Sequence, residues 1–123
     1  MYNIKFYRTD KGYSEIEEFL DNLRIRSLKS KDSRIQHKQA MLYIQLLEDY
    51  GTTLGENVTK HLEDKIWELR PGKNRILFFF EDDETFILLH HFRKKTQKTP
   101  RKEIEKAKNE MKDWIERKEN QNE

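Results

Sequence analysis

The feature that most constrains the fold of this chain is a pair of apolar runs separated by a short acidic segment. The first run, RILFFFE (75–81), is apolar at consecutive positions, which is typical of a strand buried on both faces. The second run, FILLHHF (86–92), has the same aliphatic and aromatic character, and DDE (82–84) supplies a turn between them. These runs therefore predict two adjacent antiparallel strands.

The N-terminal half predicts one strand and two helices. Residues 2–8 alternate between apolar and polar side chains, as a half-buried strand does. Ser14 and Glu17 form a capping box at the start of an amphipathic helix. A second amphipathic helix follows the polar break at 29–33 and closes at Gly51.

The C-terminal half predicts a strand before the hairpin and a helix after it. Residues 66–70 alternate as a strand, and Pro100 suits the first position of a helix capped by Thr99. Two helices followed by a run of antiparallel strands, rather than alternating βαβ units, predict an α+β fold. We expect the first strand to join this mostly antiparallel sheet as an edge or neighbour. The expected single domain covers 1–119, with a polar tail at 120–123.

The composition excludes several classes of site. The chain has no cysteine, which rules out disulfides, thiolate nucleophiles and Cys-ligated zinc. Its four histidines lack the His-x-x-x-His spacing of a helical metal site, so we expect no metal and no cofactor. The sequence starts without the apolar core of a signal peptide and contains no apolar run of membrane-spanning length, so we expect a soluble cytoplasmic protein.

Positive charge is concentrated in one segment, although the formal net charge is only +2. Residues 85–102 contain six Lys or Arg and no Asp or Glu. This segment joins the end of a predicted strand to the start of a predicted helix, where backbone N–H groups and cationic side chains converge on anions. Arg101 and Lys102 oppose the helix dipole, which is understandable if an anion binds there. The anion most worth considering is the phosphate backbone of a nucleic acid.

Two motifs in this half resemble a known family. WELRPGKNRILFFF (67–80) and LLHHFRKKTQKTPRKEIEKAKNEM (88–111) closely resemble the RelE/HigB superfamily of toxins from bacterial type II toxin–antitoxin systems. The phage-type HigB-like branch is the most similar. One departure is visible, because this branch commonly reads LHGF or LHAF where this chain has His91.

The resemblance implies a small RNase-like fold with the order β-α-α-β-β-β-α. It implies a metal-independent endoribonuclease, an mRNA interferase, that cleaves messenger RNA on the translating 70S ribosome and arrests growth. It also implies a helix-turn-helix antitoxin partner (HigA-like) and a toxin–antitoxin complex of higher order, such as a heterotetramer.

Cleavage of RNA by its own 2′-hydroxyl needs a base, cations for the charge that develops on phosphorus, and an acid for the leaving oxygen. Arg70 and Arg75 flank the PGKN turn, and the planar guanidinium suits phosphate. Lys94 and Lys95 follow the third strand, and either is an alternative to a histidine as base. His91 replaces a small residue and is the more accessible of the two adjacent histidines. The candidate catalytic residues are therefore Arg70, Arg75, Lys94, Lys95 and His91.

A second group of residues is expected to bind RNA: Lys60, Phe92, Lys98, Arg101 and Lys102. Phe92 offers a ring on which a base can stack, and the others offer charge. Plainer interpretations remain open for all of them. Phe92 fits the core equally well, the cations fit a solvated surface, and Arg70 or Arg75 fits an ion pair with Glu68.

Simple alternation also predicts which way the residues of the last strand face. His90 is expected on one face with Phe86, Leu88 and Phe92, and His91 on the other with Ile87 and Leu89.

Two other functions remain open. ParE-like relatives share the fold and inhibit DNA gyrase without cleaving RNA, in which case Arg75 and Lys94 would be dispensable. A catalytically inactive nucleic-acid-binding module would show salt-dependent RNA binding without cleavage. For antitoxin binding, Trp114 is either an anchor or a cap on the core.

Overall fold

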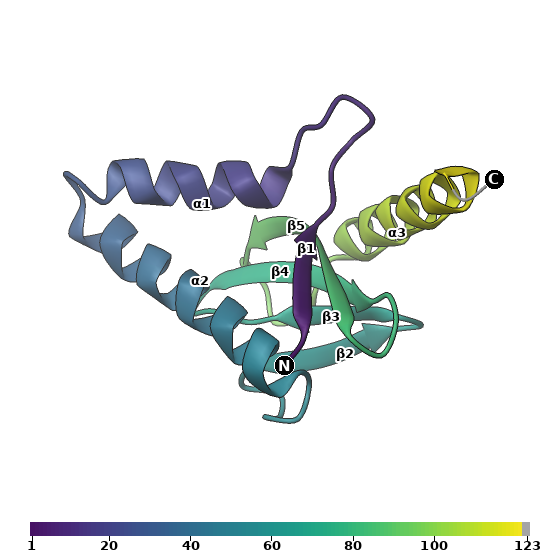
Figure 1. The fold of residues 1–123 in the computed structure, drawn as a ribbon. Coiled ribbons are helices and arrows are strands. Elements are labelled where there is room, and N and C mark those ends of the chain that lie inside the picture. Colours follow the sequence, from purple (N-terminus) through teal and green to yellow (C-terminus); the bar gives the residue numbers. More distant parts are fainter. Residues whose placement is uncertain (122–123) are drawn as a thin grey trace.

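The computed structural model describes residues 1–121 as a five-stranded mixed sheet packed with three helices (Figure 1). The elements in chain order are β1 (Asn3–Phe6), α1 (Glu15–Arg26), α2 (Lys31–Tyr50), β2 (Thr59–Glu63), β3 (Ile66–Leu69), β4 (Asn74–Phe80), β5 (Thr85–Arg93) and α3 (Arg101–Gln121). The strand order is β1-β5-β4-β3-β2. β1 runs parallel to β5 at one edge, and the remaining pairs are antiparallel. The predicted α+β class is confirmed.

The helices cover both faces of the sheet. On one face α1 and α2 pack over β4, β5 and β3, where the buried residues are Ile16, Phe19, Leu23, Ala40, Leu47, Leu69, Ile76, Phe78, Phe86 and Leu88. On the other face α3 packs over Tyr7, Ile66, Leu77, Phe79, Ile87 and Leu89 through its buried Ala107. The central β4 is buried from both sides, as its sequence predicts.

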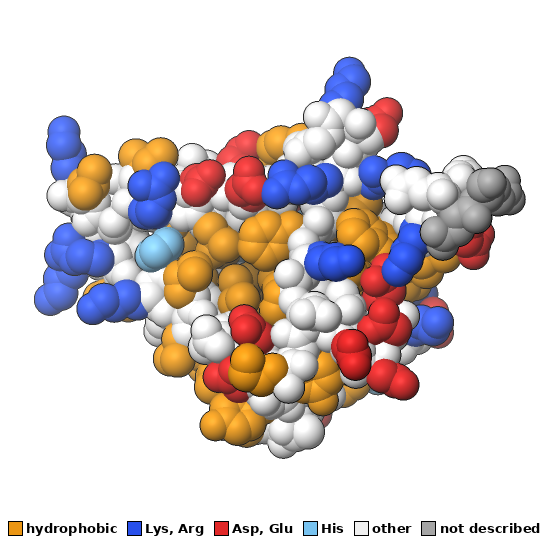
Figure 2. Space-filling model, viewed as in Figure 1, with side chains coloured by type: hydrophobic (Ala, Val, Ile, Leu, Met, Phe, Trp, Pro, Cys, Tyr) orange, Lys and Arg blue, Asp and Glu red, His pale blue; other side chains and the backbone are white. Residues whose placement is uncertain are grey.

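Part of the α1–α2 face remains open. Figure 2 shows apolar side chains gathered in the hollow bounded by α1, α2 and β1. Phe6, Leu20, Tyr43 and Ile44 are only partly buried there, against the core.

The structure contains a strand, β2, that the sequence did not predict. Lys60 and His61 lie in β2, where they pair with Glu68 and Trp67 of β3. β2 forms the edge of the sheet, and its Lys60 and His61 are exposed to solvent. A charged edge strand of this kind shows no apolar alternation. The sheet therefore contains one more antiparallel strand than the expected three.

Two of the three predicted helix caps are confirmed. The hydroxyl of Ser14 accepts a hydrogen bond from the Glu17 backbone N–H at 3.1 Å, and Gly51 ends α2 with φ of 62°. The predicted cap at Thr99 is wrong. Its hydroxyl instead donates to the buried carboxylate of Glu68 at 2.5 Å, because a buried charge makes the stronger acceptor.

The C-terminal helix extends beyond the expected domain end at residue 119. α3 continues to Gln121, and residues 122–123 of the predicted polar tail lie outside the described residues. Within the described chain, 1–121, no helix is both long and apolar enough to cross a membrane.

A bulge in β5 overturns the predicted facing of its histidines. The pairing with β4 runs through Leu88 and then His90, so that Leu89 is an extra residue. Leu89 and His90 consequently both face α3, whereas His91 faces α1. Simple alternation fails here because a bulge inserts one residue into the two-residue period.

Candidate functional site

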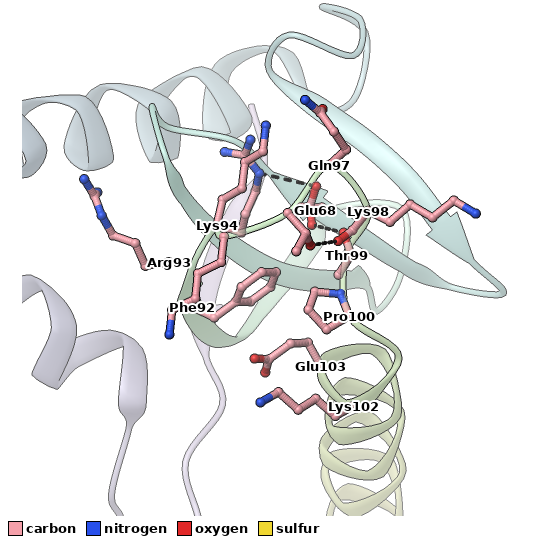
Figure 3. A pocket seen from close by; sticks show the side chains of 13 residues that line it. Glu68, Phe92, Arg93, Lys94, Gln97, Lys98, Thr99, Pro100, Lys102 and Glu103 are labelled. Carbon is pink, nitrogen blue, oxygen red and sulfur yellow. Dashed lines mark hydrogen bonds and ion pairs between the residues drawn. The ribbon is translucent and has the colours of Figure 1, made fainter.

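A pocket of about 570 Å³ opens between the end of β5, the loop after it and the start of α3 (Figure 3). We call it the basic pocket. Six of its thirteen lining residues are Lys or Arg and two are Glu: Arg75, Arg93, Lys94, Lys95, Lys98 and Lys102, with Glu68 and Glu103. The remaining wall is Phe92, Thr96, Gln97, Thr99 and Pro100. This excess of cations makes the pocket suited to an anionic ligand.

The loop between β5 and α3 is fixed at both ends. The Lys94 backbone N–H donates to the Lys73 carbonyl at 2.7 Å, which joins the loop to the β3–β4 turn. Within the loop, the Thr96 hydroxyl donates to the Lys98 carbonyl at 2.7 Å. At the other end, the Pro100 carbonyl accepts the Glu103 N–H and starts α3. These contacts hold the lysines of the loop around the pocket.

Arg75 is the most buried cation of the basic pocket. Its side chain is 8% exposed, and its Nη1 donates to the carbonyls of Gly72 and Asn74 at 2.7 and 2.9 Å. Its Nε lies 3.6 Å from a carboxylate oxygen of Glu68, which is itself 2% exposed. Burial lowers the pKa of Arg75, and the Glu68 carboxylate opposes that change. An arginine keeps its charge under such conditions, so the pocket contains a fixed cation.

Arg70 reaches the same carboxylate from the end of β3. Its Nε lies 3.4 Å from Glu68 Oε1, and its Nη1 donates to the Glu56 carbonyl at 2.9 Å. Within residues 1–121 the buried Nε makes no hydrogen bond. Both arginines therefore lie within ion-pair distance of Glu68, as the ion-pair interpretation expects.

Arg70 lines a smaller pocket of about 210 Å³ beside the basic pocket. The two pockets share four lining residues: Glu68, Gln97, Lys98 and Thr99. Lys60 and His61 of β2 form the outer wall of the smaller one.

The structure brings most of the sequence-predicted site residues together. Arg75, Phe92, Lys94, Lys95, Lys98 and Lys102 line the basic pocket, and Arg70 and Lys60 line the smaller one. Phe92 also packs against the core beneath α3. The observed position of this ring is therefore compatible both with a core residue and with a surface on which a base can stack.

Arg101 lies apart from these residues. Its guanidinium bonds to Glu63 (Nη1 to Oε1, 2.6 Å) and to Glu105 (Nε to Oε1, 3.1 Å). Two carboxylates therefore occupy the donors that an RNA phosphate would need.

His91 lies on the opposite face of the sheet from the basic pocket. Its ring stacks on Phe19 of α1 with 3.6 Å between ring centroids, and its Nε2 lies 3.3 Å from Asn74 Oδ1. Burial lowers the pKa of His91 to about 4, so the ring is uncharged at neutral pH. The bulge at Leu89 thus separates His91 from Arg75 and Lys94.

Sequence reasoning did not place Glu68 and Glu103 in the pocket wall. One signal for Glu68 was available: it lies two residues after Ile66 and therefore shares the face of its strand with that apolar residue. An inward carboxylate next to arginines is a site candidate rather than a surface partner. No comparable signal exists for Glu103. Among residues 1–121, no three His, Cys, Asp or Glu side chains are placed to hold a metal ion.

Comparison with known proteins identifies a family and a similar solved structure. The family described as "Phage derived protein Gp49-like (DUF891)" matches residues 26–112, which include every residue of both pockets. The "YoeB-YefM complex from Staphylococcus aureus" is 14% identical, with 74% of this chain and 94% of that chain covered and a TM-score of 0.47. No curated protein matches this chain.

Proposed function

This chain belongs to the Gp49-like family of phage-derived proteins, and from that premise we propose that it is the toxin of a bacterial type II toxin–antitoxin system. The proposed activity is that of a HigB-like mRNA interferase, an endoribonuclease that cuts messenger RNA on the ribosome. The observation that carries this proposal is the basic pocket, in which buried Arg75 and surrounding lysines lie beside the buried carboxylate of Glu68.

The pocket contains two of the three kinds of group that metal-independent RNA cleavage needs, cations and a base. The ribose 2′-oxygen attacks phosphorus, the bond to the 5′-oxygen breaks, and a 2′,3′-cyclic phosphate and a 5′-hydroxyl result. Arg75, Lys94 and Lys95 bind the phosphoryl oxygens and stabilise their developing charge. Glu68 accepts the 2′-hydroxyl proton, and its hydrogen bond from Thr99 fixes the carboxylate for that role. His91 has no part in this scheme, because it lies on the other face.

The smaller pocket provides a path for the rest of the RNA strand. Lys60, Arg70 and Lys98 line it, and it continues into the basic pocket through four shared residues. Phe92 offers the ring face on which an unstacked base can rest.

The partners in this proposal are the 70S ribosome with its mRNA and a HigA-like helix-turn-helix antitoxin, in the cytoplasm. Exposed apolar side chains of α1, α2 and the turn between them are the candidates for antitoxin contact: Ile25, Leu28, Ile35, Met41 and Leu42. Trp114 is a weaker candidate, because it packs partly buried against the core and its indole N–H donates to Glu81.

The test is to add purified protein to ribosomes programmed with a defined mRNA and to map new 5′ ends, with free mRNA in parallel. We expect cuts in the A-site codon only when ribosomes are present. Arg75→Gln should slow cutting about 100- to 1,000-fold, the usual cost of losing one donor to the transition state. Arg24→Gln, which changes an exposed arginine on α1, is the matched control.

Intact message from folded, antitoxin-free protein would contradict the proposal. A gyrase supercoiling assay on the same preparation would then separate a ParE-like inhibitor from an inactive nucleic-acid-binding module.

A further inference from the structure

A fully buried histidine lies directly behind the basic pocket and has no role in the chemistry described above. His90 in β5 is 0% exposed, and each of its ring nitrogens faces a carboxylate of α3. Nδ1 lies 2.5 Å from Glu110 Oε1, and Nε2 lies 3.2 Å from Glu103 Oε1. The two glutamates are about two helical turns apart and therefore share the face of α3 that covers the sheet.

Two contacts of this kind require two protons. A neutral imidazole has one N–H donor and one bare nitrogen, so a bare nitrogen facing a carboxyl group needs a proton on that carboxyl. Burial raises the pKa of Glu110, which favours an O–H that donates to Nδ1. The Nε2–H of His90 is then aimed at Glu103.

Of the three connected side chains Glu110, His90 and Glu103, Glu103 is the one that reaches the basic pocket. Its carboxyl group lines the basic pocket beside Phe92 and Lys102 (Figure 3), whereas His90 and Glu110 are behind it. The pocket thus contains two carboxyl groups, Glu68 on β3 and Glu103 on α3. Two carboxyl groups held in different surroundings are the usual arrangement for a separate base and acid.

Three further titratable groups face these side chains from neighbouring elements. Lys106 of α3 lies between the two glutamates in sequence and bonds to Glu15 of α1 at 2.6 Å. Both act on the charge of Glu110. Tyr7, which follows β1, is close enough to Glu110 for that carboxylate to help raise the phenol pKa, and its hydroxyl donates to Asp113 at 2.7 Å.

We propose, building on the ribonuclease function, that Glu103 is a catalytic residue that protonates the departing 5′-oxygen. In its acid form Glu103 carries a third proton, beyond those on His90 and Glu110, on one carboxyl oxygen while the other oxygen accepts the His90 Nε2–H. When the P–O5′ bond breaks, this Glu103 proton moves to O5′ and Glu103 becomes a carboxylate, while Glu68 holds the proton from the 2′-hydroxyl. The His90 Nε2–H donates to the new carboxylate. After product leaves, Glu68 releases its proton to solvent and Glu103 regains one. His90 and Glu110 are positioning residues that hold the Glu103 carboxyl at the pocket wall.

The experiment uses short synthetic mRNAs on programmed ribosomes with either the natural 5′-oxygen or a 5′-sulfur at the scissile bond. A thiolate leaves without a proton, so the sulfur linkage removes the need for an acid. On the oxygen linkage, Glu103→Gln should cut about 100- to 10,000-fold more slowly than wild type, as general acids usually contribute. On the sulfur linkage, the two proteins should cut at the same rate.

Two variants serve as controls. Arg75→Gln should remain slow on both linkages, because it stabilises charge on phosphorus rather than on the leaving atom. Glu105→Gln removes an exposed carboxylate that bonds to Arg101 on the same helix and should behave as wild type.

Equal defects of Glu103→Gln on both linkages, or none on either, would overturn the assignment while leaving the ribonuclease intact. A wild-type protein that cuts neither substrate would overturn the ribonuclease function and the acid together. The folded His90→Gln variant should cut the oxygen linkage more slowly than wild type, though less slowly than Glu103→Gln does. It should cut the sulfur linkage at the wild-type rate. A defect in His90→Gln that persists on sulfur would instead assign His90 to the fold alone.

Discussion

The two adjacent histidines of β5 show how strongly local surroundings determine the chemistry of a single residue. His90 lies between two carboxyl groups of α3, and His91 stacks on the ring of Phe19. Burial against an aromatic ring disfavours a positive imidazole, and this lowers the pKa of His91 from an ordinary 6.5 to about 4. One histidine is therefore built into a proton network, and the other behaves as a packed ring.

The depressed pKa of His91 predicts a loss of stability in mild acid. The unfolded chain binds a proton near pH 6.5, whereas the folded chain does so only near pH 4, so stability decreases as the pH falls through this window. The expected loss is about 2 kcal/mol by pH 5. His91→Phe keeps a ring against Phe19 and should lose less stability than wild type between pH 7 and pH 5, measured by urea unfolding. His37→Gln, a half-exposed histidine on α2, is the control and should follow wild type.

At the scale of elements, the end of α2 is fitted closely against β1. The Tyr2 backbone N–H donates to the Glu48 carbonyl at 2.8 Å, and Gly51 ends the helix with φ of 62°. A Cβ on Gly51 would lie 2.9 Å from Cε2 of Tyr2. Glycine is therefore required at position 51 for two reasons. The backbone has a positive φ, and the Tyr2 ring leaves no room for a Cβ.

Replacing Gly51 by alanine should cost more than the backbone angle alone explains. Gly12 provides the matched comparison, since it also has positive φ, 86°, but has nothing within 4 Å of the added Cβ. We expect Gly12→Ala to lose about 1–2 kcal/mol, the usual penalty of a left-handed alanine. Gly51→Ala should lose at least about 1 kcal/mol more through the contact with Tyr2. Equal urea midpoints for the two variants would show that Tyr2 moves aside without cost.

The same scale shows what the sequence could predict. The hairpin of β4 and β5, both N-terminal helices and the burial of Ile104 and Ala107 follow from apolar spacing, which depends on local periodicity. β2 escaped prediction because an edge strand needs no apolar alternation. The bulge at Leu89 escaped it because only pairing with β4 reveals the extra residue. The cations of the site were evident as a charge run, but the carboxyl groups opposite them come from β3 and α3, and only the fold brings those together.

At the scale of the whole molecule, charge is distributed unevenly over a chain that is nearly neutral. The net charge is +2, yet the basic pocket has six cations and two carboxylates in its wall. Elsewhere several cations are paired with carboxylates, as in Arg8 with Glu17 and Lys106 with Glu15. An RNA strand would therefore meet its strongest attraction at one place on the surface.

This distribution predicts a strong dependence of RNA binding on salt. Affinity for a 2′-O-methyl RNA, which resists cleavage, should fall with log salt by about 0.7 for each phosphate contacted. Lys98→Gln, which removes a cation shared by both pockets, should reduce that slope by roughly 0.7. Lys29→Gln, an exposed lysine between α1 and α2, should leave it unchanged. Equal slopes in a fluorescence titration of both variants would remove Lys98 from the RNA path.

The parallel pairing of β1 with β5 has a consequence for how the protein is made. Asn3 pairs with Thr85, so β1 has no partner until β5, more than 80 residues later, has been synthesised. The pocket needs residues up to Glu103, and its helical wall needs α3 to pack behind them. A nascent chain therefore has no assembled pocket until residues through Glu103 have been synthesised and α3 has packed behind them.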